Sequence, residues 1–337
     1  MLELFLNKPK QMELRSMEAL PALKDDEVKI RLVYGGICGS DLSVFLGKLT
    51  HASYPLRPGH ELLGHIIEAG KNVSYKLGTR IIVQPNSYCG ECVNCLKGQT
   101  NICPEKKSLG VTVNGGFSEQ FIISSKYVMP VPDDLPDERA VLVEPFAVIV
   151  HAFKKVHITK GTTVAVLGCG NEGMLAVALA HYLGADVTAM DINPIKLELI
   201  KTLGDIRVIH PDELKGETFD IVVEAAGAQS AFENGLRLVR PGGQMILIGL
   251  TPEATIPVIR VVRSEITLYG SIIYNIPDDF QHAMEYLRDT NFNVQPIVSK
   301  IIPFTDYKHA FEDALSGNYG KVVLDFKKKS CIISLNR

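Results

Sequence analysis

Hydrophobic and polar residues alternate along the first part of the chain. The alternation is clearest over residues 27–34 (EVKIRLVY), 61–69 (ELLGHIIEA) and 79–84 (TRIIVQ). This period is typical of strands that bury one face, and Gly and Pro between the segments indicate turns. The pattern therefore predicts a β-rich region over roughly the first 150 residues.

The pattern changes near Glu144, where helical spacing begins and runs over residues 146–156. Short apolar runs then alternate with helical segments such as residues 174–183. The runs lie at residues 163–167, 186–190, 220–224 and 244–248. Strands that alternate with helices in this way predict βαβ units and a parallel sheet, so we expect an α/β protein. A further helix is expected at residues 278–289 and a last strand at 321–326.

Length and charge narrow the class of protein. The chain has 337 residues and a net charge of −3, which suggests about two domains and argues against a nucleic-acid or anionic-membrane partner. No apolar run approaches the roughly 18 residues that a membrane span needs. The N-terminus lacks the basic and apolar regions of a signal peptide. We therefore expect a cytoplasmic protein whose cysteines stay reduced.

A glycine-rich turn follows the apolar run at residues 163–167. Gly168, Gly170 and Gly173 form the pattern G-x-G-x-x-G, with Asn171 and Glu172 between the last two glycines. A strand before this pattern and a helix after it predict a dinucleotide site with the pyrophosphate at the helix N-terminus. Asp191 ends the next apolar run, where a carboxylate accepts a ribose hydroxyl and repels a 2′-phosphate. The pattern favours NAD over NADP; the alternative is an α/β domain that binds no nucleotide.

Four of the seven cysteines lie close together in the sequence. They are Cys89, Cys92, Cys95 and Cys103. Four thiolates on a short lobe can surround one tetrahedral Zn²⁺ and leave no open position, which is the arrangement of a structural zinc site. The alternatives are two disulfides or an iron–sulfur cluster. Neither suits a cytoplasmic NAD protein whose cysteines stay reduced and have this spacing.

A second, looser set of zinc-ligand residue types is Cys38, His60 and Glu144. Three protein ligands and a water define a catalytic zinc site. Taken singly, each residue has an ordinary structural interpretation: a buried small side chain, an unremarkable histidine and a charge near a helix N-terminus. Their spacing leaves both interpretations open.

Several ordered motifs resemble the zinc-dependent medium-chain alcohol dehydrogenase family over essentially the whole chain. They include G-I-C-G-S-D at 36–41, P-G-H-E at 58–61, the four-cysteine lobe, E-P-F-A-V-I-V-H-A at 144–152 and G-K-V-V-L at 320–324. The resemblance implies a GroES-like catalytic domain over residues 1–147 and 275–337. A Rossmann NAD-binding domain of doubly wound parallel sheet is implied at 148–274, with the active site in the cleft between the two.

The resemblance also implies roles for individual residues. Cys38, His60 and Glu144 would bind catalytic zinc, with Glu61 beside the metal either as an alternating ligand or as a support of the ligands. With the four-cysteine site, this makes two zinc ions per chain. Asp41 would orient His60, and Ser40 would accept the proton of the substrate alcohol, whose pKa zinc lowers as a Lewis acid. Lys196 is expected beside the adenine, with a solvated surface lysine as the alternative.

The sequence E-P-F-A-V at Glu144 is similar to the polyol (sorbitol-like) dehydrogenase branch. Two departures matter: Ser43 stands where many members have a relay histidine, and Ile272-Ile273-Tyr274 replaces a run whose arginine holds the polyol. We therefore expect oxidation of a secondary alcohol of a polyol, sugar alcohol or sugar-alcohol phosphate, with NAD as acceptor. L-threonine or aminocyclitol dehydrogenase is the alternative. Arg57 is a candidate phosphate contact or an ordinary surface residue.

Interpretations from other classes are a catalytically silent cofactor-binding relative and a zinc-ribbon nucleic-acid binder. The intact Cys38, His60, Glu144 and Ser40 set argues against the first, and the net charge of −3 against the second. The family resemblance implies a homodimer or homotetramer formed through the Rossmann domain, with residues 265–274 as a contact. Cys169 and Cys331 are left without a metal-binding role.

Overall fold

The computed structural model describes residues 1–214 and 216–327, and Cys331 lies outside these residues. The chain forms two compact units. Unit 1 contains Met1–Glu144, Val298–Ser316 and residues 321–327, and unit 2 contains Pro145–Ile297 and Gly317–Gly320. Within the described residues, no helix is both long and apolar enough to cross a membrane.

Unit 1 is built on a sheet in the strand order β14-β15-β3-β4-β5-β7, with β6 also paired to β3 and a separate hairpin of β1 and β2. The strands are β1 (Leu2–Lys8), β2 (Gln11–Ser16), β3 (Glu27–Ile37), β4 (Glu61–Ala69), β5 (Arg80–Val83), β6 (Gln120–Ser124), β7 (Val128–Pro130), β14 (Val298–Pro303) and β15 (Lys321–Asp325). Its helices are α1 (Gly39–Leu46), α2 (Val93–Leu96), α3 (Asp137–Ala140) and α10 (Tyr307–Ser316), with 3₁₀ turns at Thr100–Ile102, Ser125–Tyr127 and Phe304–Asp306.

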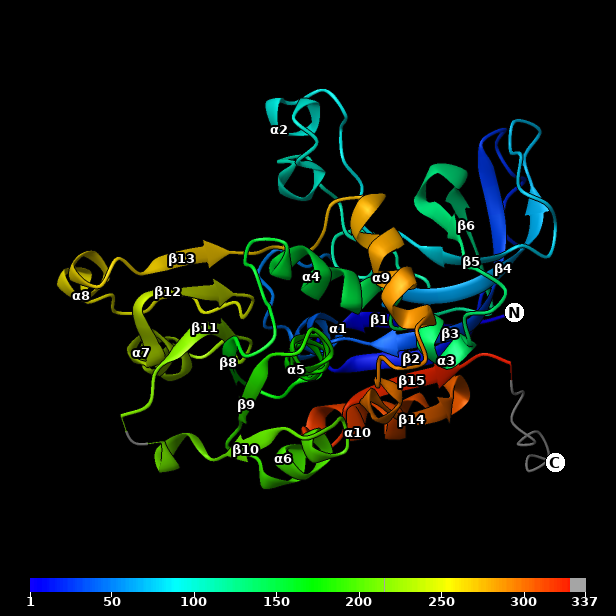
Figure 1. Ribbon diagram of the computed structural model, residues 1–337. Coiled ribbons are helices and arrows are strands. Elements are labelled where there is room, and N and C mark those ends of the chain that lie inside the picture. The colour runs from blue at the N-terminus through cyan, green and yellow to red at the C-terminus, as the bar shows by residue number, and fades with distance from the viewer. Residues whose placement is uncertain (215, 328–337) are drawn as a thin grey trace. The chain divides into compact units, whose positions relative to one another are not determined.

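Unit 2 contains a six-stranded parallel sheet in the order β10-β9-β8-β11-β12-β13 (Figure 1). The strands are β8 (Thr163–Leu167), β9 (Asp186–Met190), β10 (Arg207–Ile209), β11 (Phe219–Glu224), β12 (Val239–Leu247) and β13 (Thr267–Gly270). The helices are α4 (Val143–Phe153), which starts at the unit boundary, α5 (Asn171–Tyr182), α6 (Pro194–Lys201), α7 (Gln229–Leu238), α8 (Val258–Arg263) and α9 (Asp278–Arg288), with 3₁₀ turns at Pro211–Glu213 and Gln295–Ile297. Strand order reverses between β8 and β11, and ligands of such sheets bind outside the carboxyl ends of the strands at this point.

The predicted fold class is confirmed. The runs at 163–167 and 186–190 form central strands β8 and β9, whose residues are almost all buried, as expected of a parallel sheet covered on both faces. The α4 helix begins at Val143, three residues before the predicted start at residue 146. Val143 is apolar and fully buried, so it extends the apolar pattern of the helix. Strand β12 begins at Val239 because this residue already pairs with Phe219 before the irregularity in the ladder.

Candidate functional site

The candidate catalytic residues of unit 1 are brought together by two neighbouring strands. Cys38 directly follows β3 and His60 directly precedes β4, and the two strands are antiparallel with Gly36 opposite Glu61. The ligand atoms of Cys38, His60 and Glu61 consequently lie within 4.8 Å of one another. A thiol, an imidazole and a carboxylate at this spacing form a donor set that suits Zn²⁺.

Asp41, in the first turn of α1, holds this group in place. Its Oδ2 accepts the backbone N–H of Cys38 at 3.0 Å, and its Oδ1 accepts that of Gly59 at 3.1 Å. The same Oδ1 lies 3.3 Å from His60 Nδ1. Nδ1 makes no hydrogen bond within the described structure, but the charge of Asp41 lies on this side of the ring, and Nε2 on the opposite side can act as a ligand.

Ser40 lies on the ligand side of the imidazole, with its Oγ 3.4 Å from His60 Nε2. His60 itself is buried. Burial alone would lower the pKa of His60, but Asp41 and Cys38 outweigh it and hold this pKa well above the ordinary value. The surroundings of His60 therefore favour positive charge, either on the imidazole ring itself or on a bound cation.

Glu61 has no solvent exposure and uses only one of its oxygens within the described structure. Oε1 pairs with Lys321 Nζ at 2.5 Å, whereas Oε2 is buried without a hydrogen-bond partner. A Cβ at residue 36 would lie 2.0 Å from this Oε2, so Gly36 provides the space for it. An orphaned carboxylate oxygen beside a thiol and an imidazole fits a metal ion, because buried polar atoms are otherwise paired.

Glu144, the third predicted zinc ligand, lies in the first turn of α4 and is buried, with a relative exposure of 7%. Among the described residues, the set of mutually close ligand atoms contains Glu61 and does not include Glu144. The structure thus gathers Cys38, His60 and Glu61, and the part of Glu144 in metal binding stays a prediction.

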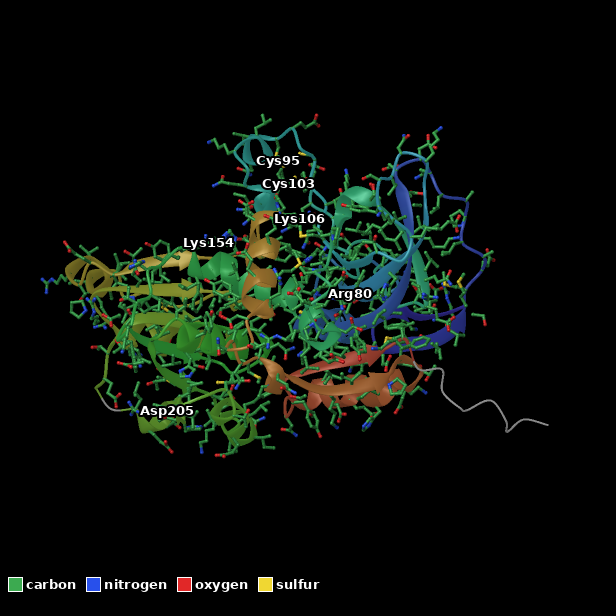
Figure 2. All side chains as sticks on the ribbon, turned by 45° about the vertical axis from the view of Figure 1, so that its right-hand side comes forward. Arg80, Cys95, Cys103, Lys106, Lys154 and Asp205 are labelled. Carbon is green, nitrogen blue, oxygen red and sulfur yellow. The ribbon has the colours of Figure 1, made fainter. Side chains whose placement is uncertain are left out.

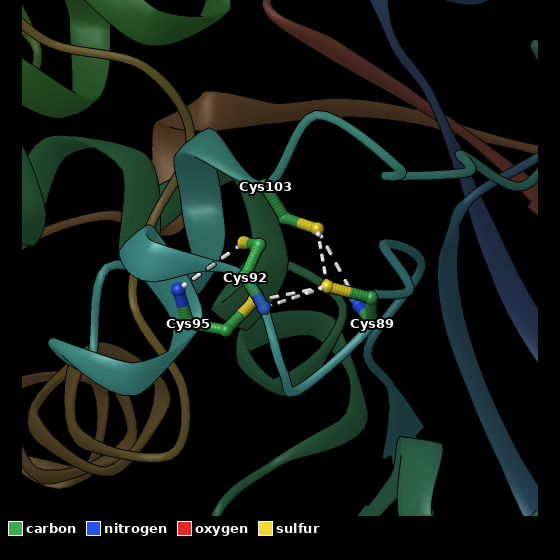
Figure 3. Close-up of side chains that lie close together, drawn as sticks. All are labelled: Cys89, Cys92, Cys95 and Cys103. Carbon is green, nitrogen blue, oxygen red and sulfur yellow. Dashed lines mark hydrogen bonds between the residues drawn. The ribbon is translucent and has the colours of Figure 1, made fainter.

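The four cysteines Cys89, Cys92, Cys95 and Cys103 converge at one point of unit 1 (Figure 3). Sγ of Cys89 lies 3.6 Å from that of Cys103 and 3.9 Å from that of Cys95. With Zn–S bonds of about 2.3 Å, the edges of a ZnS₄ tetrahedron are about 3.8 Å long. The spacing fits one ion with four thiolates and no open position.

The backbone of this lobe favours the thiolate form of Cys89, whereas burial raises the pKa of Cys95 to about 12. The N–H groups of Cys92 and Cys95 point at the sulfurs of Cys89 and Cys92, at 3.3 and 3.4 Å. Backbone N–H groups of Glu91 and Cys92 lower the pKa of Cys89 to about 7. Figure 2 labels Cys95 and Cys103 on the lobe, and all four thiols are free of disulfide bonds.

In unit 2, the glycine-rich turn joins β8 to α5 as the motif predicts. Gly168 has a φ of +91°, and a Cβ on Gly173 would lie 1.8 Å from the carbonyl oxygen of Gly168. A Cβ on Gly170, by contrast, would meet open space at the N-terminus of α5. The first and third glycines serve the turn and its packing, and the second leaves room for a ligand to approach the backbone. Asn171 and Glu172 are the first two residues of α5.

Asp191 directly follows β9 and caps the backbone of this turn. Its Oδ2 accepts the N–H of Cys169 at 2.6 Å and its Oδ1 that of Asn193 at 2.8 Å. The carboxylate is therefore fixed beside the glycine-rich turn. Its position in the sequence is also the one expected of an acid that binds ribose.

Lys196 is buried, and its Nζ donates to the backbone carbonyl of Tyr319. Asn193 Nδ2 likewise donates to the carbonyl of Gly317 at 3.0 Å. These contacts attach Gly317–Gly320 to unit 2. Because its ammonium group is buried and bound, Lys196 is not the solvated surface lysine that was the alternative expectation. Its predicted place beside an adenine stays a prediction.

Arg57 is held inside unit 1 by its guanidinium group. The side chain is only 13% exposed, Nη1 donates to Glu3 at 2.9 Å, and Nε donates to the carbonyl of Gly115 at 2.6 Å. Arg57 is therefore an internal support, because its guanidinium is already bound to a carboxylate and to the backbone. The expectation of a surface residue was wrong.

Sequence reasoning missed Lys321, the buried partner of Glu61. The residue lies in the G-K-V-V-L run, which contributed to the resemblance but received no role. The available signal was a lysine at the start of an otherwise apolar strand, an arrangement that is rare unless the charge is paired. It also missed Asp279, which is nearly fully buried at the start of α9 and lies 2.9 Å from His151.

The chain matches two protein-family models. One, the alcohol dehydrogenase GroES-like domain, covers residues 24–133, and the other, zinc-binding dehydrogenase, covers residues 173–289. The chain is 32% identical to the D-arabitol-phosphate dehydrogenase of Enterococcus avium, over 91% of this chain and 92% of that protein. It is also 32% identical to the sorbitol dehydrogenase of Bacillus subtilis, over 88% of each chain.

A similar solved structure is that of RspB from Escherichia coli CFT073, described as a short chain alcohol dehydrogenase and complexed with NADH. It has a TM-score of 0.89 and 25% sequence identity, and the alignment covers 96% of this chain and 98% of that chain. The likeness extends over both units of the present chain.

Proposed function

Because this chain belongs to the zinc-binding dehydrogenase family, we propose that it oxidises a secondary hydroxyl of a polyol, sugar alcohol or sugar-alcohol phosphate to a ketone, with NAD as hydride acceptor. The observation that carries the proposal is the convergence of Cys38, His60 and Glu61, with the free Glu61 oxygen among them. In this proposal residues 148–274 bind NAD, and residues 1–147 with 275–337 hold the zinc ions.

The residues around Cys38 have separate tasks in this reaction. Zinc, when bound by Cys38, His60 and a glutamate, supplies a Lewis acid that lowers the pKa of the substrate hydroxyl. Asp41 holds His60 in the orientation that keeps Nε2 on the ligand side. Ser40 Oγ, 3.4 Å from that nitrogen, is placed to accept the hydroxyl proton and pass it on.

The chemistry of the cofactor site favours NAD. NAD supplies the carbon that receives the hydride. The glycine-rich turn offers backbone N–H groups at the N-terminus of α5 to the pyrophosphate, with Gly170 leaving space for its approach. The carboxylate of Asp191 accepts the ribose hydroxyls and opposes a 2′-phosphate by charge.

Turnover of a panel of alcohols, followed through the NADH absorbance band, tests the substrate class. The panel contains sugar alcohols, their phosphates, cyclitols and L-threonine, each with NAD and with NADP. We expect turnover of one or more polyols or polyol phosphates with NAD. Turnover of threonine alone, or strict dependence on NADP, would contradict the proposal.

Metal analysis of matched variants tests the two zinc sites separately. We expect two zinc ions per chain in the wild type. Cys38→Ser should remove one ion together with activity, and Cys92→Ser should remove the other. A wild type that holds only one zinc ion per chain, and keeps that ion in Cys38→Ser, would leave the four-cysteine site and refute the catalytic one.

We also propose that the protein is a homo-oligomer formed through unit 2. Strand β13 ends the parallel sheet, so its outer edge has no neighbour within the described chain. Beside it, Val258, Ile259 and Val262 of α8 are 63–68% exposed. A second copy related by a two-fold axis can pair with this edge and cover the same apolar residues, because such a contact is self-complementary.

Light scattering after size exclusion tests this contact. A Val258→Glu, Val262→Glu variant is expected to give a monomer at micromolar concentration. Leu77→Glu, at an equally exposed residue of unit 1, serves as the control and should leave the oligomer intact. A monomeric wild type would refute the contact.

A further inference from the structure

The carboxyl end of β11 carries a buried acid. Glu224, the last residue of this strand, is 1% exposed. Its carboxyl group bonds to the backbone, because the N–H groups of Ala226 and Gly227 donate to Oε1 at 2.9 and 2.8 Å. Burial raises the pKa of Glu224, and these backbone N–H groups offset the effect only in part. Burial of a carboxyl group costs stability, so stability alone does not explain an acid at this position.

Glu224 connects the loops that follow two neighbouring strands. Its side chain holds the loop at residues 225–227, after β11. Its carbonyl oxygen accepts the N–H groups of Ile248 and Gly249, after β12, at 2.9 and 3.0 Å. Gly249 leaves room for this arrangement, because a Cβ there would lie 2.4 Å from Glu224 Oε2 and 2.3 Å from the backbone nitrogen of Gly227. One residue therefore fixes both loops relative to one another.

The loop at residues 225–227 packs directly against the glycine-rich turn. The N–H of Ala225 donates to the carbonyl of Leu167 at 2.9 Å, and a Cβ on Gly168 would lie 2.6 Å from the backbone nitrogen of Ala226. The strands before these two loops, β8 and β11, are the neighbours between which strand order reverses. Dinucleotides bind outside the carboxyl ends of the strands at this point. The loop therefore borders the proposed cofactor site, and all of these residues belong to unit 2.

A fixed loop at this place favours ligand binding. Without bonds to its N–H groups, the loop would sample several conformations, and a ligand would have to order it on binding. Ordering a segment costs conformational entropy, which is subtracted from the affinity. The cost is greatest for glycine, and Gly227 is held at a φ of +66°. The carboxyl group of Glu224 removes this freedom before the ligand arrives.

We propose that Glu224 is a positioning residue for the dinucleotide. By accepting the N–H groups of Ala226 and Gly227, it holds the loop at residues 225–227 against the glycine-rich turn in the form that receives the cofactor. The part about the cofactor rests on the proposed function. The part about the loop stands on the contacts of Glu224 alone.

Two substitutions in the zinc-loaded full chain separate the hydrogen bonds of Glu224 from its charge. Glu224→Gln removes the charge but keeps an oxygen that can accept both N–H groups. Glu224→Met has a similar length and removes both. The fluorescence of NADH measures cofactor affinity, which should stay within threefold of the wild type in Glu224→Gln and fall at least tenfold in Glu224→Met. Equal weakening in the two variants would assign the effect to charge and overturn the proposal.

Hydrogen exchange followed by mass spectrometry separates a positioning role from a general structural one. Without cofactor, Glu224→Met should exchange at least tenfold faster in the peptide that contains Ala226 and Gly227. The peptide that contains Cys89, in unit 1, should be unchanged. Glu285→Met, the same substitution at an exposed residue of unit 2, is the matched control and should resemble the wild type in exchange and in NADH affinity. Wild-type exchange of the loop in Glu224→Met would refute the proposal.

Gly249→Ala keeps the test decisive if Glu224→Met does not fold. It retains the carboxyl group but displaces it, because the new Cβ would lie 2.4 Å from Oε2. Faster exchange of the loop and weaker NADH binding are expected, and wild-type values of both would refute the role of Glu224. If the wild type binds no NADH, the cofactor part of the proposed function and the positioning role both fall. The exchange data without cofactor would then still decide whether Glu224 holds the loop.

Discussion

Lys321 and Glu61 form an ion pair in which neither side chain has any solvent exposure. The two residues are 260 positions apart in the chain, and they lie on β15 and β4, which flank β3 on either side. Glu61 also belongs to the candidate catalytic group, so this pair fixes the orientation of a carboxylate whose other oxygen is buried without a hydrogen-bond partner.

Removing the lysine should destabilise unit 1 strongly. Lys321→Met leaves Glu61 buried without its counter-charge, which typically costs about 3–5 kcal/mol. Lys321→Arg retains the charge and should cost less. The free energy of unfolding from urea titrations measures both, with Lys24→Met at an exposed pair as the control. A loss below about 1 kcal/mol for Lys321→Met, the range of a surface pair, would contradict the prediction.

Asp41→Asn should weaken the catalytic metal site without unfolding the protein. The amide oxygen can accept only one of the two backbone N–H groups that the carboxylate accepts, and the charge that faces His60 is lost. Loss of such a supporting carboxylate commonly reduces zinc affinity by about 10–100-fold. Competition with a chromophoric chelator measures this affinity, and the ion of the four-cysteine site should be retained with wild-type kinetics. Equal weakening of both ions would indicate a general loss of structure instead.

Two glycines of the same turn should respond differently to alanine. Gly173→Ala places a Cβ 1.8 Å from the carbonyl of Gly168 and should lower the melting temperature markedly. Gly170→Ala meets open space, so the melting temperature should stay close to that of the wild type. NADH binding should nevertheless weaken, because a methyl group then occupies the approach to the backbone. Tight NADH binding by Gly170→Ala, followed by fluorescence, would refute the placement of the pyrophosphate.

The stability of unit 2 should depend on Asp220 in a defined pH window. Hydrogen bonds from Thr163 and the charge of Arg240 lower the pKa of Asp220 to about 2, below the value of about 3.9 in an unfolded chain. The ionised form therefore stabilises the fold fully above about pH 4 and loses this effect as the pH falls toward 2. The stability difference between wild type and Asp220→Asn should be constant from pH 5 to 7 and shrink below pH 4. Asp212→Asn, at a residue that is 90% exposed, serves as the control substitution.

Sequence patterns predict those parts of the fold that are determined by residues close together in the chain. The central strands β8 and β9 and the glycine-rich turn were predictable because burial and tight turns restrict the residue types at each position. The convergence of the four cysteines was predictable for a similar reason, since a short lobe limits how far its sulfurs can separate. The choice between zinc and the alternatives rested on the chemistry of thiolates in a reducing environment.

Contacts between distant segments were not predictable in this way. Glu61 and Lys321 meet only because β3 is paired with both β4 and β15, and no local period encodes that pairing. The same holds for Asp279 and His151, 128 residues apart. Arg57 shows the opposite error: a surface residue was expected, yet Glu3 from the N-terminal hairpin supplies the partner that allows burial.

The four residues Gly317–Gly320 belong to unit 2, although the chain on both sides of them belongs to unit 1. A fragment expressed as residues 145–297 would therefore lack the carbonyl of Tyr319, which receives the buried ammonium of Lys196, and the carbonyl of Gly317, which receives Asn193. Excision of the nucleotide-binding half as one continuous piece is thus expected to give a poorly folded product. A chain in which a short linker joins residue 297 to residues 317–320 is the smallest fragment that preserves these hydrogen bonds.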